Sequence, residues 1–250
     1  MKHVQAIILA GGRGKRMGVH EMQNKVMIPL NGKPMLAYPV ERLARMGIEH
    51  PIVVVGHAKE SIFSYFGDSL IYAEQKQQLG TADAVGSALP FVDKDCVDVV
   101  VLYGDHCAFY TEEVLQTVLK LHTAQQADVT LISTTVENPF GYGRILRDEN
   151  GEVSGIVEEK NATDEQKKIR EINTGNAVYK KSFLLKTLPL VKMNEVSQEY
   201  YLTDVFEIGV RLGAKIQSWN GRDEALGMGV NSPDQLVVAE QEMKKRTAKI

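Results

Sequence analysis

The sequence predicts an α/β fold with a mixed, mainly parallel sheet, helices on both faces and a β-rich insertion in its second half. Two observations support this prediction. Short runs rich in valine and isoleucine alternate with helical patterns, and a later Asn-Gly pair lies between two apolar runs. Because each crossover between parallel strands packs a helix against the sheet, such alternation is typical of strands covered on both faces.

Five elements of this alternation lie in the first half of the chain. Valine- and isoleucine-rich runs predict strands, and apolar positions three and four residues apart predict helices. The expected strands cover residues 4–9, 52–55 and 97–102, and the expected helices cover residues 35–45 and 112–126.

The order of elements changes after the second of these helices. Residues 143–147 and 153–158 flank a turn that ends in Asn150-Gly151. An Asn-Gly pair between apolar runs is a strong short-range signal for a β-hairpin. We therefore expect a β-rich insertion here.

A final helix is expected near the end of the chain. Ser232 supplies an N-cap, Pro233 occupies the first helical position and Gln235 lies three residues after the cap. The basic residues 244–246 are expected to form a solvated face that complements the helix dipole, rather than a nucleic-acid site.

Composition excludes several classes of function. The 250 residues, 44% hydrophobic and 24% charged with a net charge of −3, indicate a globular protein without the strong field that recruits nucleic acid or a membrane. The apolar run at residues 4–10 is too short to span a bilayer, so a cytoplasmic location is expected. Cys96 and Cys107 form no metal or redox spacing, and nothing indicates an oligomeric state.

A glycine-rich, basic loop follows the first expected strand. It reads Leu9-Ala10-Gly11-Gly12-Arg13-Gly14-Lys15-Arg16-Met17. In an open α/β sheet the ligand crevice lies at the carboxyl ends of the strands. Glycines let backbone N–H groups approach phosphate oxygens, and the three basic side chains add positive charge. The loop is interpreted as a phosphate cradle, with a plain tight turn as the alternative.

Two other phosphate-binding motifs fit this loop poorly. A P-loop needs serine or threonine after Gly14-Lys15, where Arg16 stands, and it needs glycine at Leu9. A dinucleotide fingerprint needs glycine at Met17 and an acid after the second strand, which ends Val55-Gly56-His57. These departures argue against a nicotinamide-dependent oxidoreductase.

Further motifs follow the loop in order along the chain. They are Lys25, Gln75, Leu79-Gly80-Thr81, Tyr103-Gly104-Asp105, Gly141-Tyr142-Gly143-Arg144-Ile145, Gly155-Ile156-Val157-Glu158, Glu171-Ile172-Asn173-Thr174-Gly175, Tyr200-Tyr201-Leu202-Thr203-Asp204 and Gly229-Val230-Asn231. With them the chain resembles the sugar-nucleotide pyrophosphorylases, a nucleotidyltransferase family. The resemblance is greatest to the uridylyltransferase half of bacterial bifunctional enzymes that also acetylate glucosamine 1-phosphate.

This resemblance implies a Rossmann-like, glycosyltransferase-A-like fold and a reaction. A uridylyl group would pass from UTP to a sugar 1-phosphate, with N-acetylglucosamine 1-phosphate as the expected acceptor and Mg²⁺ as the cofactor. Glucose 1-phosphate as acceptor, dTTP as donor, and a non-catalytic sugar-nucleotide sensor are the alternatives. Retention of Lys25, Asp105 and Asn231 argues against a sensor, which needs neither a metal nor a charge clamp.

The resemblance also implies roles for single residues. The nucleotide would be bound by Leu9, Ala10, Gly11, Gly12, Gln75, Gly80, Thr81, Tyr103 and Gly104. Arg16, Lys25 and Asp105 would be catalytic, the first two through the phosphates, and Asp105 with Asn231 would ligate Mg²⁺. The sugar would be bound by Gly141, Glu158, Asn173, Tyr201 and Thr203. The Gln75 amide would offer both a donor and an acceptor to a pyrimidine edge.

Residues 1–250 are expected to form one nucleotidyltransferase domain. About 1–110 would bind nucleotide, about 111–231 would bind sugar, and 232–250 would form the last helix. Since no hexapeptide repeat follows Asn231, acetyltransferase activity is not expected.

The chain also departs from the family pattern at a few positions. Asn24 stands where the family usually has proline, Gly11 where its closest members have alanine, and Met228 where they have glutamate. His106-Cys107-Ala108 replaces a proline-containing turn, and His106 is expected to pack rather than to touch substrate. The last of these departures bears more on sugar preference than on nucleotide chemistry.

Overall fold

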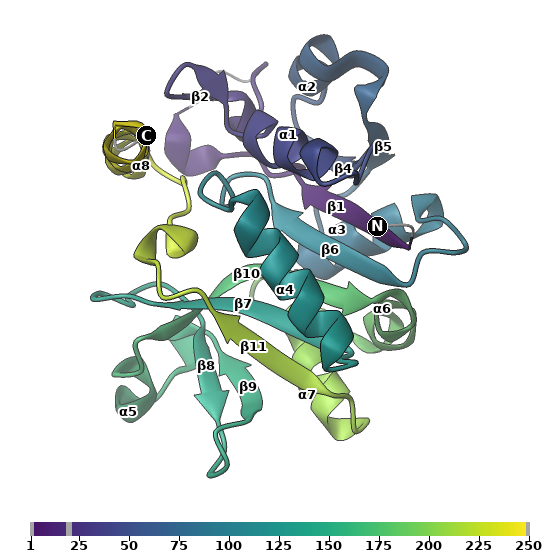
Figure 1. Ribbon diagram of the computed structural model, residues 1–250, viewed down its shortest axis with the longest axis vertical. Helices are drawn as coiled ribbons and strands as arrows, with labels where there is room; N and C mark the ends of the chain where they lie inside the picture. The colour runs from purple at the N-terminus through teal and green to yellow at the C-terminus, as the bar shows by residue number, and fades with distance from the viewer. Residues whose placement is uncertain (1–2, 19–21, 249–250) are drawn as a thin grey trace.

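A nine-stranded mixed sheet forms the centre of the protein in the computed structural model, which describes residues 3–18 and 22–248 (Figure 1). Its main path runs β11-β7-β10-β6-β1-β4-β5, and β8 and β9 extend from β10. The strands are β1 (Val4–Leu9), β4 (Ile52–Val55), β5 (Ile71–Glu74), β6 (Asp98–Tyr103), β7 (Val129–Thr135), β8 (Arg144–Arg147), β9 (Val153–Val157), β10 (Glu171–Lys180) and β11 (Ile216–Asn220). The two short strands β2 (Pro29–Leu30) and β3 (Lys33–Pro34) pair separately.

Parallel pairing dominates the main path of this sheet. β1 lies parallel to β4 and β6, β4 lies parallel to β5, and β11 lies parallel to β7. Only β10 runs antiparallel to its neighbours on the main path, β6 and β7. The predicted mixed, mainly parallel α/β sheet is confirmed.

Helices cover both faces of the sheet. They are α1 (Ala37–Arg45), α2 (Glu60–Phe66), α3 (Thr81–Ala88), α4 (Glu112–Ala124), α5 (Asp164–Lys167), α6 (Lys181–Thr187), α7 (Asp204–Arg211) and α8 (Pro233–Thr247). Short 3₁₀ turns are η1 (Lys15–Met17), η2 (Lys25–Met27), η3 (Gly67–Ser69), η4 (Leu89–Phe91), η5 (Glu159–Asn161), η6 (Leu188–Leu190) and η7 (Glu224–Gly227). None of the helices in the described ranges is long and apolar enough to cross a membrane.

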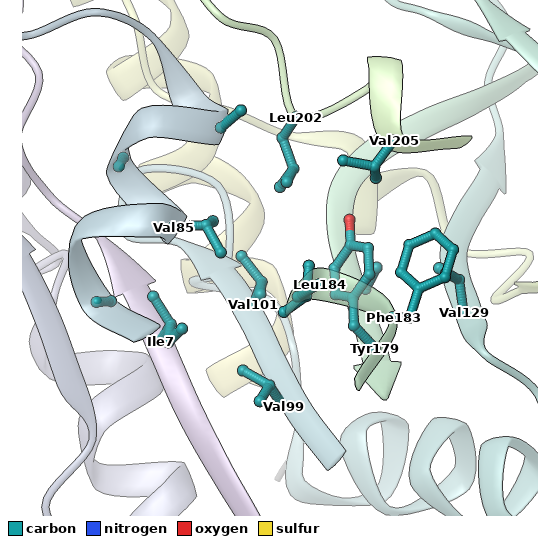
Figure 2. Close-up of a cluster of buried hydrophobic side chains, with 14 of the residues drawn as sticks. Ile7, Val85, Val99, Val101, Val129, Tyr179, Phe183, Leu184, Leu202 and Val205 are labelled. Carbon is teal, nitrogen blue, oxygen red and sulfur yellow. The ribbon is translucent and has the colours of Figure 1, made fainter. Parts of the chain in front are cut away.

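The two largest hydrophobic clusters of the core lie one on each face of the sheet. Successive side chains of a strand point to opposite faces, so Ile7 joins one cluster and Ile8 the other. The first cluster packs β1, β6 and β10 against α3, α6 and α7, with Val85 and Leu184 among its members (Figure 2). The second packs the opposite face against α1, α2 and α4. Burial on both faces explains why the central strands are continuous apolar runs.

The predicted elements lie close to the observed ones. The strands at 4–9 and 52–55 are confirmed, and the third is β6, shifted by one residue to Asp98–Tyr103. The two helices are confirmed as α1 and α4, both shorter than predicted by two residues. The hairpin is confirmed as antiparallel β8 and β9, with Gly151 at φ +80° in its turn.

The last helix begins as predicted, but one expectation about its end is wrong. Ser232 Oγ accepts a hydrogen bond from Gln235 N at 3.3 Å, as an N-cap does. Arg246 does not belong to a merely solvated face, because its guanidinium pairs with both Asp223 carboxylate oxygens at 2.7 and 2.8 Å. This ion pair joins α8 to the segment that leads into η7.

Candidate active site

A cavity of about 580 Å³ opens at the carboxyl ends of β1, β5 and β6. It is lined by Leu9, Ala10, Gly11, Gly12, Arg13, Gly14, Asn24, Lys25, Val26, Gln75, Gln78, Gly80, Thr81, Ala84, Tyr103, Asp105 and Glu199. The predicted nucleotide-binding residues, apart from Gly104, and the predicted catalytic Lys25 and Asp105 are thus brought to one place. Its position at the strand ends is the usual ligand crevice of an open α/β sheet.

Strand register sets two of the motifs side by side. Leu9, the last residue of β1, pairs with Tyr103, the last residue of β6. Gly104 N then donates to Leu9 O at 3.0 Å, so the glycine-rich loop and the segment that carries Asp105 leave the sheet together. A side chain on Gly104 would meet Val26 Cγ1 at 3.1 Å and Leu9 O at 3.2 Å, which explains the glycine.

Gln75 lies after β5 with its amide fixed in one orientation. Its Nε2 donates to Gly80 O at 3.0 Å and to Asp83 Oδ2 at 2.7 Å. Because both partners are acceptors, the NH₂ must face them and Oε1 is left toward Gly11, whose Cβ would lie 3.1 Å away. The expectation that Gln75 offers a donor as well as an acceptor is therefore wrong: its two N–H groups are engaged, and an acceptor remains.

The Gly80-Thr81 segment docks against a second motif more than a hundred residues away. Tyr200 N donates to Leu79 O at 2.7 Å, and Ala82 N donates to Tyr200 O at 3.0 Å. Leu202 N donates to Thr81 Oγ1 at 2.9 Å. These bonds join the start of α3, on one side of the cavity, to the segment that leads into α7.

Gly80 cannot accept a side chain in this arrangement. Its φ of 104° and ψ of −176° lie in a region that is essentially restricted to glycine. A Cβ would also lie 2.5 Å from Tyr200 O and 2.8 Å from Tyr200 N.

Replacing Gly80 with alanine should therefore destabilise the protein. We expect Gly80→Ala to lower the free energy of unfolding by about 2 kcal/mol or more, measured by urea denaturation. Gly86→Ala is the matched control, since Gly86 lies in α3, the helix that Gly80 directly precedes, and its Cβ would meet nothing within 4 Å. That control is expected to stabilise α3 by up to about 1 kcal/mol. Equal effects of the two substitutions would contradict the close approach of Tyr200.

Lys25 lies between the two predicted metal ligands. Its Nζ donates to Asp105 Oδ2 in a short ion pair and to Asn231 Oδ1 at 2.8 Å. The Lys25 and Asp105 side chains are only 11% and 17% exposed. A carboxylate and an amide oxygen, 126 residues apart in sequence, therefore converge on one cationic group.

The backbone holds Asn231 beside Asp105. Val230 N donates to Asp105 O at 2.9 Å, which pairs the two segments directly. Asn231 N donates to Gln235 Oε1 at 2.8 Å. The Gln235 side chain therefore binds the backbone N–H of Asn231, and not that of Ser232, the N-cap of α8.

This donor set fits Mg²⁺. Magnesium is bound by one or two protein oxygens and otherwise by water and substrate phosphate. Asp105 and Asn231 supply one carboxylate and one amide oxygen directed at the same point. Within residues 3–18 and 22–248, no cluster of three or more His, Cys, Asp or Glu side chains could hold a metal instead.

Of the three predicted catalytic residues, Arg16 is the one that does not line the cavity. Arg16, on η1, is exposed and is not among the lining residues. Arg13 lines the cavity, and its Nε donates to Gln78 Oε1 at 2.8 Å. Gln78 and Glu199 also line it and were not predicted as site residues, because neither belongs to a motif with a recognisable spacing.

None of the five predicted sugar-binding residues lines the cavity, and one of them, Glu158, lies near Tyr103. Burial raises the pKa of the Tyr103 phenol to about 12, and a hydrogen bond with Thr81 opposes the shift. Burial also raises the pKa of the Glu158 carboxyl, while the Thr203 hydroxyl and Lys160 act to lower it. The Glu158 charge in turn contributes to the raised pKa of Tyr103, so the two groups are neighbours.

Asn173 and Gly141 are set by local hydrogen bonds. Asn173 is 9% exposed, and its Oδ1 accepts from Gly175 N at 3.0 Å. Gly141, at φ +85°, donates its N–H to Glu159 Oε2 at 3.3 Å, and the same oxygen accepts from Arg144 at 2.5 Å. Tyr201 lies under the Lys160 ammonium, 5.0 Å from Nζ to the ring centroid.

His106 packs inside the fold, as expected. Its Nε2 lies 2.6 Å from Gly227 O, and its ring is close enough to Gly229 that a Cβ there would lie 3.1 Å from Nδ1. Burial lowers the pKa of this imidazole, which favours its neutral form.

Comparison with known proteins places the chain in a class. The profile of the nucleotidyl transferase family matches residues 5–225, and the chain belongs to that family. It is 39% identical over 246 residues to the "Bifunctional protein GlmU" of Brevibacillus brevis strain 47, covering 98% of this chain and 53% of that protein. It is 41% identical over 242 residues to the protein of the same name from Geobacillus sp. strain WCH70, covering 96% and 52%. The chain thus spans about half the length of these curated relatives.

A solved structure shares the fold. It is that of a protein named "Putative Glucose-1-Phosphate Thymidylyltransferase" from Bacillus anthracis in complex with a sucrose, and it matches with a TM-score of 0.77 and 21% identity. The match covers 96% of this chain and 94% of that one. The predicted Rossmann-like nucleotidyltransferase fold is confirmed.

Proposed function

We propose that the protein transfers a uridylyl group from UTP to a sugar 1-phosphate, with N-acetylglucosamine 1-phosphate as the acceptor, and releases pyrophosphate. The observation that carries the proposal is the convergence of Lys25, Asp105 and Asn231 beside the glycine-rich loop in a nucleotidyltransferase fold. The relatives named "Bifunctional protein GlmU" support the acceptor, since the motifs also resembled those of a bacterial bifunctional enzyme with a uridylyltransferase half.

The chemistry requires alignment and charge stabilisation rather than a nucleophilic side chain. A sugar 1-phosphate is anionic near neutral pH, so its oxygen can attack the α-phosphorus without a general base. The two anions repel each other, and charge develops on the departing pyrophosphate. Backbone N–H groups of the glycine-rich loop and the Lys25 ammonium can bind those oxygens.

Mg²⁺ bound by Asp105 and Asn231 would neutralise phosphate charge as a Lewis acid. The Lys25 ammonium lies between the Asp105 and Asn231 oxygens. The same side chain is long enough to turn toward phosphates in the adjoining cavity, which it lines. Asp105 and Asn231 would then hold Mg²⁺, and Lys25 would bind the phosphates.

The fixed amide of Gln75 supports uracil as the base. Uracil has an N3–H donor between two carbonyl groups, and Gln75 Oε1 is an acceptor that can receive it. Cytosine presents an acceptor at N3 and is disfavoured there. Thymine has the same N3–H, so this contact does not separate UTP from dTTP.

A matrix of substrates tests the proposal. Initial rates of pyrophosphate release would be measured with UTP, dTTP, CTP, GTP and ATP, each against N-acetylglucosamine 1-phosphate and glucose 1-phosphate. We expect the UTP and N-acetylglucosamine 1-phosphate pair to be fastest. A higher rate with dTTP and glucose 1-phosphate would replace the proposed substrates, and no release with any pair would refute transferase activity.

Asn173 is expected to bind the sugar rather than to take part in chemistry. Its Oδ1 is used by Gly175 N, so its NH₂ group is the part available to a sugar hydroxyl. Asn173→Ala should raise the apparent KM for the sugar 1-phosphate by about tenfold, the scale of one hydrogen bond, with kcat within threefold. An unchanged KM for every active sugar 1-phosphate would contradict this role.

Glu158 gives the reaction a pH dependence. Because the pKa of its carboxyl is raised, protonation begins at a higher pH than for an ordinary glutamate. Protonation removes an acceptor for sugar hydroxyls, so the KM for the sugar 1-phosphate should rise as pH falls toward the acid side. Glu158→Gln should flatten the part of this profile that comes from the enzyme, while the titration of the sugar phosphate remains in both proteins. Parallel profiles would contradict the role of Glu158.

A further inference from the structure

Asn24 is a fully buried polar residue at the wall of the cavity, directly before Lys25. Its exposed fraction is 0%, and it lines the cavity together with Ala10 and Lys25. A buried amide is costly unless its donors and acceptors are paired. Asn24 makes hydrogen bonds to groups on four segments. Two of these segments, the glycine-rich loop and η2, carry the groups proposed to bind phosphate.

The donor end of the side chain holds the glycine-rich loop. Asn24 Nδ2 donates to Ala10 O at 2.8 Å and to His57 O at 2.7 Å. Ala10 opens the loop after β1, and His57 follows β4 in the segment before α2. His57 N in turn donates to Gly11 O at 3.3 Å. The amide thereby fixes the first turn of the loop against the neighbouring strand end.

The acceptor end fixes the segment that carries Lys25. Asn24 Oδ1 accepts from Val26 N at 3.1 Å and caps η2, whose first residue is Lys25. The backbone N–H of Asn24 donates to Ser61 Oγ at 3.1 Å, which ties the same residue to α2. One side chain therefore sets the positions of the loop and of the catalytic lysine relative to each other.

We propose that Asn24 is a positioning residue for nucleotidyl transfer, which couples the phosphate loop to Lys25; this inference rests on the proposed function. Misplacement by about 1 Å of groups that align a substrate can cost about a hundredfold in rate. The donor end acts on nucleotide binding through Ala10, and the acceptor end acts on turnover through Lys25. The two effects can be separated by substitution.

Three variants of Asn24 make this separation. Its φ of −71° and ψ of 142° are compatible with proline, so Asn24→Pro can keep the backbone conformation while it deletes the three side-chain hydrogen bonds and that of the backbone N–H. Asn24→Ala deletes the side-chain bonds alone. Asn24→Asp keeps the Oδ1 cap and replaces the two N–H donors with an oxygen that faces two carbonyl oxygens.

We expect the variants to differ in KM and kcat. Asn24→Pro and Asn24→Ala should raise the KM for UTP about tenfold and lower kcat about tenfold. Asn24→Asp should raise the KM for UTP to a similar extent with kcat within threefold. Ser61→Ala is the matched control, because it removes the Oγ acceptor and leaves the bonds of the Asn24 side chain in place. It should stay within twofold in both constants.

Dissociation constants for UTP from calorimetry and unfolding temperatures complete the test. If Asn24 is only structural, its variants will have lower unfolding temperatures. They will nevertheless keep the UTP affinity and kcat of the wild type when assayed 20 °C below their own unfolding temperatures, and that result would overturn the proposal. Should Asn24→Pro and Asn24→Ala fail to fold, an unchanged UTP affinity of Asn24→Asp overturns it. If the wild type binds UTP but makes no sugar nucleotide, the proposed function fails, and the loss of UTP affinity in the variants still decides the role of Asn24 at the loop.

Discussion

Replacing Asp105 with alanine is expected to lower turnover by about a thousandfold, the largest effect of any single substitution in the site. Asp105 is held at the end of β6, and its backbone oxygen pairs with Val230 N. Loss of the carboxylate removes the proposed charged ligand for Mg²⁺ and the partner of Lys25. A thousandfold corresponds to roughly 4 kcal/mol of transition-state stabilisation, the scale on which a bound metal acts.

Asp105→Asn separates charge from shape. It keeps the size of the side chain, so an electrostatic role predicts a loss close to that of Asp105→Ala. Magnesium-dependent pyrophosphate release would be measured for both variants after circular dichroism has confirmed that they fold. A folded Asp105→Ala protein with near-normal turnover would show that the metal ligand lies elsewhere.

Lys25→Met is expected to have the second largest effect, a loss of about a hundredfold to a thousandfold in kcat/KM. Methionine keeps much of the apolar stem and removes the ammonium that we propose to bind phosphate oxygens. Lys25→Arg should not restore the activity, because a planar guanidinium does not replace a compact ammonium between two side-chain oxygens.

The two variants should differ in metal binding. In Lys25→Met the ammonium no longer competes for Asp105 and Asn231, so affinity for Mn²⁺, measured by electron paramagnetic resonance without nucleotide, should rise. In Asp105→Ala it should fall. A fall in both variants would contradict the assignment of separate roles to Lys25 and Asp105.

Local patterns were sufficient to predict the frame of the fold. The run at residues 4–9 is buried on both faces of the sheet, and a strand of that kind has few alternatives to an apolar sequence. Ser232, Pro233 and Gln235 predicted the start of α8 because capping is decided within one turn. The ordered motifs predicted the fold family, and those that follow β1, β5 and β6 line the cavity.

Contacts between distant segments explain what was missed. Asp83 takes up one N–H of Gln75, and the exposure of Arg16 depends on how the loop lies on the surface. Arg246 meets Asp223 from a different element, which a count of basic residues near a helix end cannot reveal. At Asn24 the sequence indicated a departure from the family pattern, but the hydrogen bonds of its side chain and backbone N–H depend on the packing of β1, η2 and α2.

The central claim is that this site joins a nucleotide to a sugar 1-phosphate. Phosphorus NMR of wild-type protein with UTP, N-acetylglucosamine 1-phosphate and Mg²⁺ tests it most directly, because all substrates and products are observed together. We predict equal amounts of UDP-N-acetylglucosamine and pyrophosphate, formed only when both substrates and the metal are present, and at least a hundredfold more slowly with Asp105→Ala. Consumption of UTP without the sugar 1-phosphate, or no diphosphate-linked sugar with any acceptor, would contradict the claim.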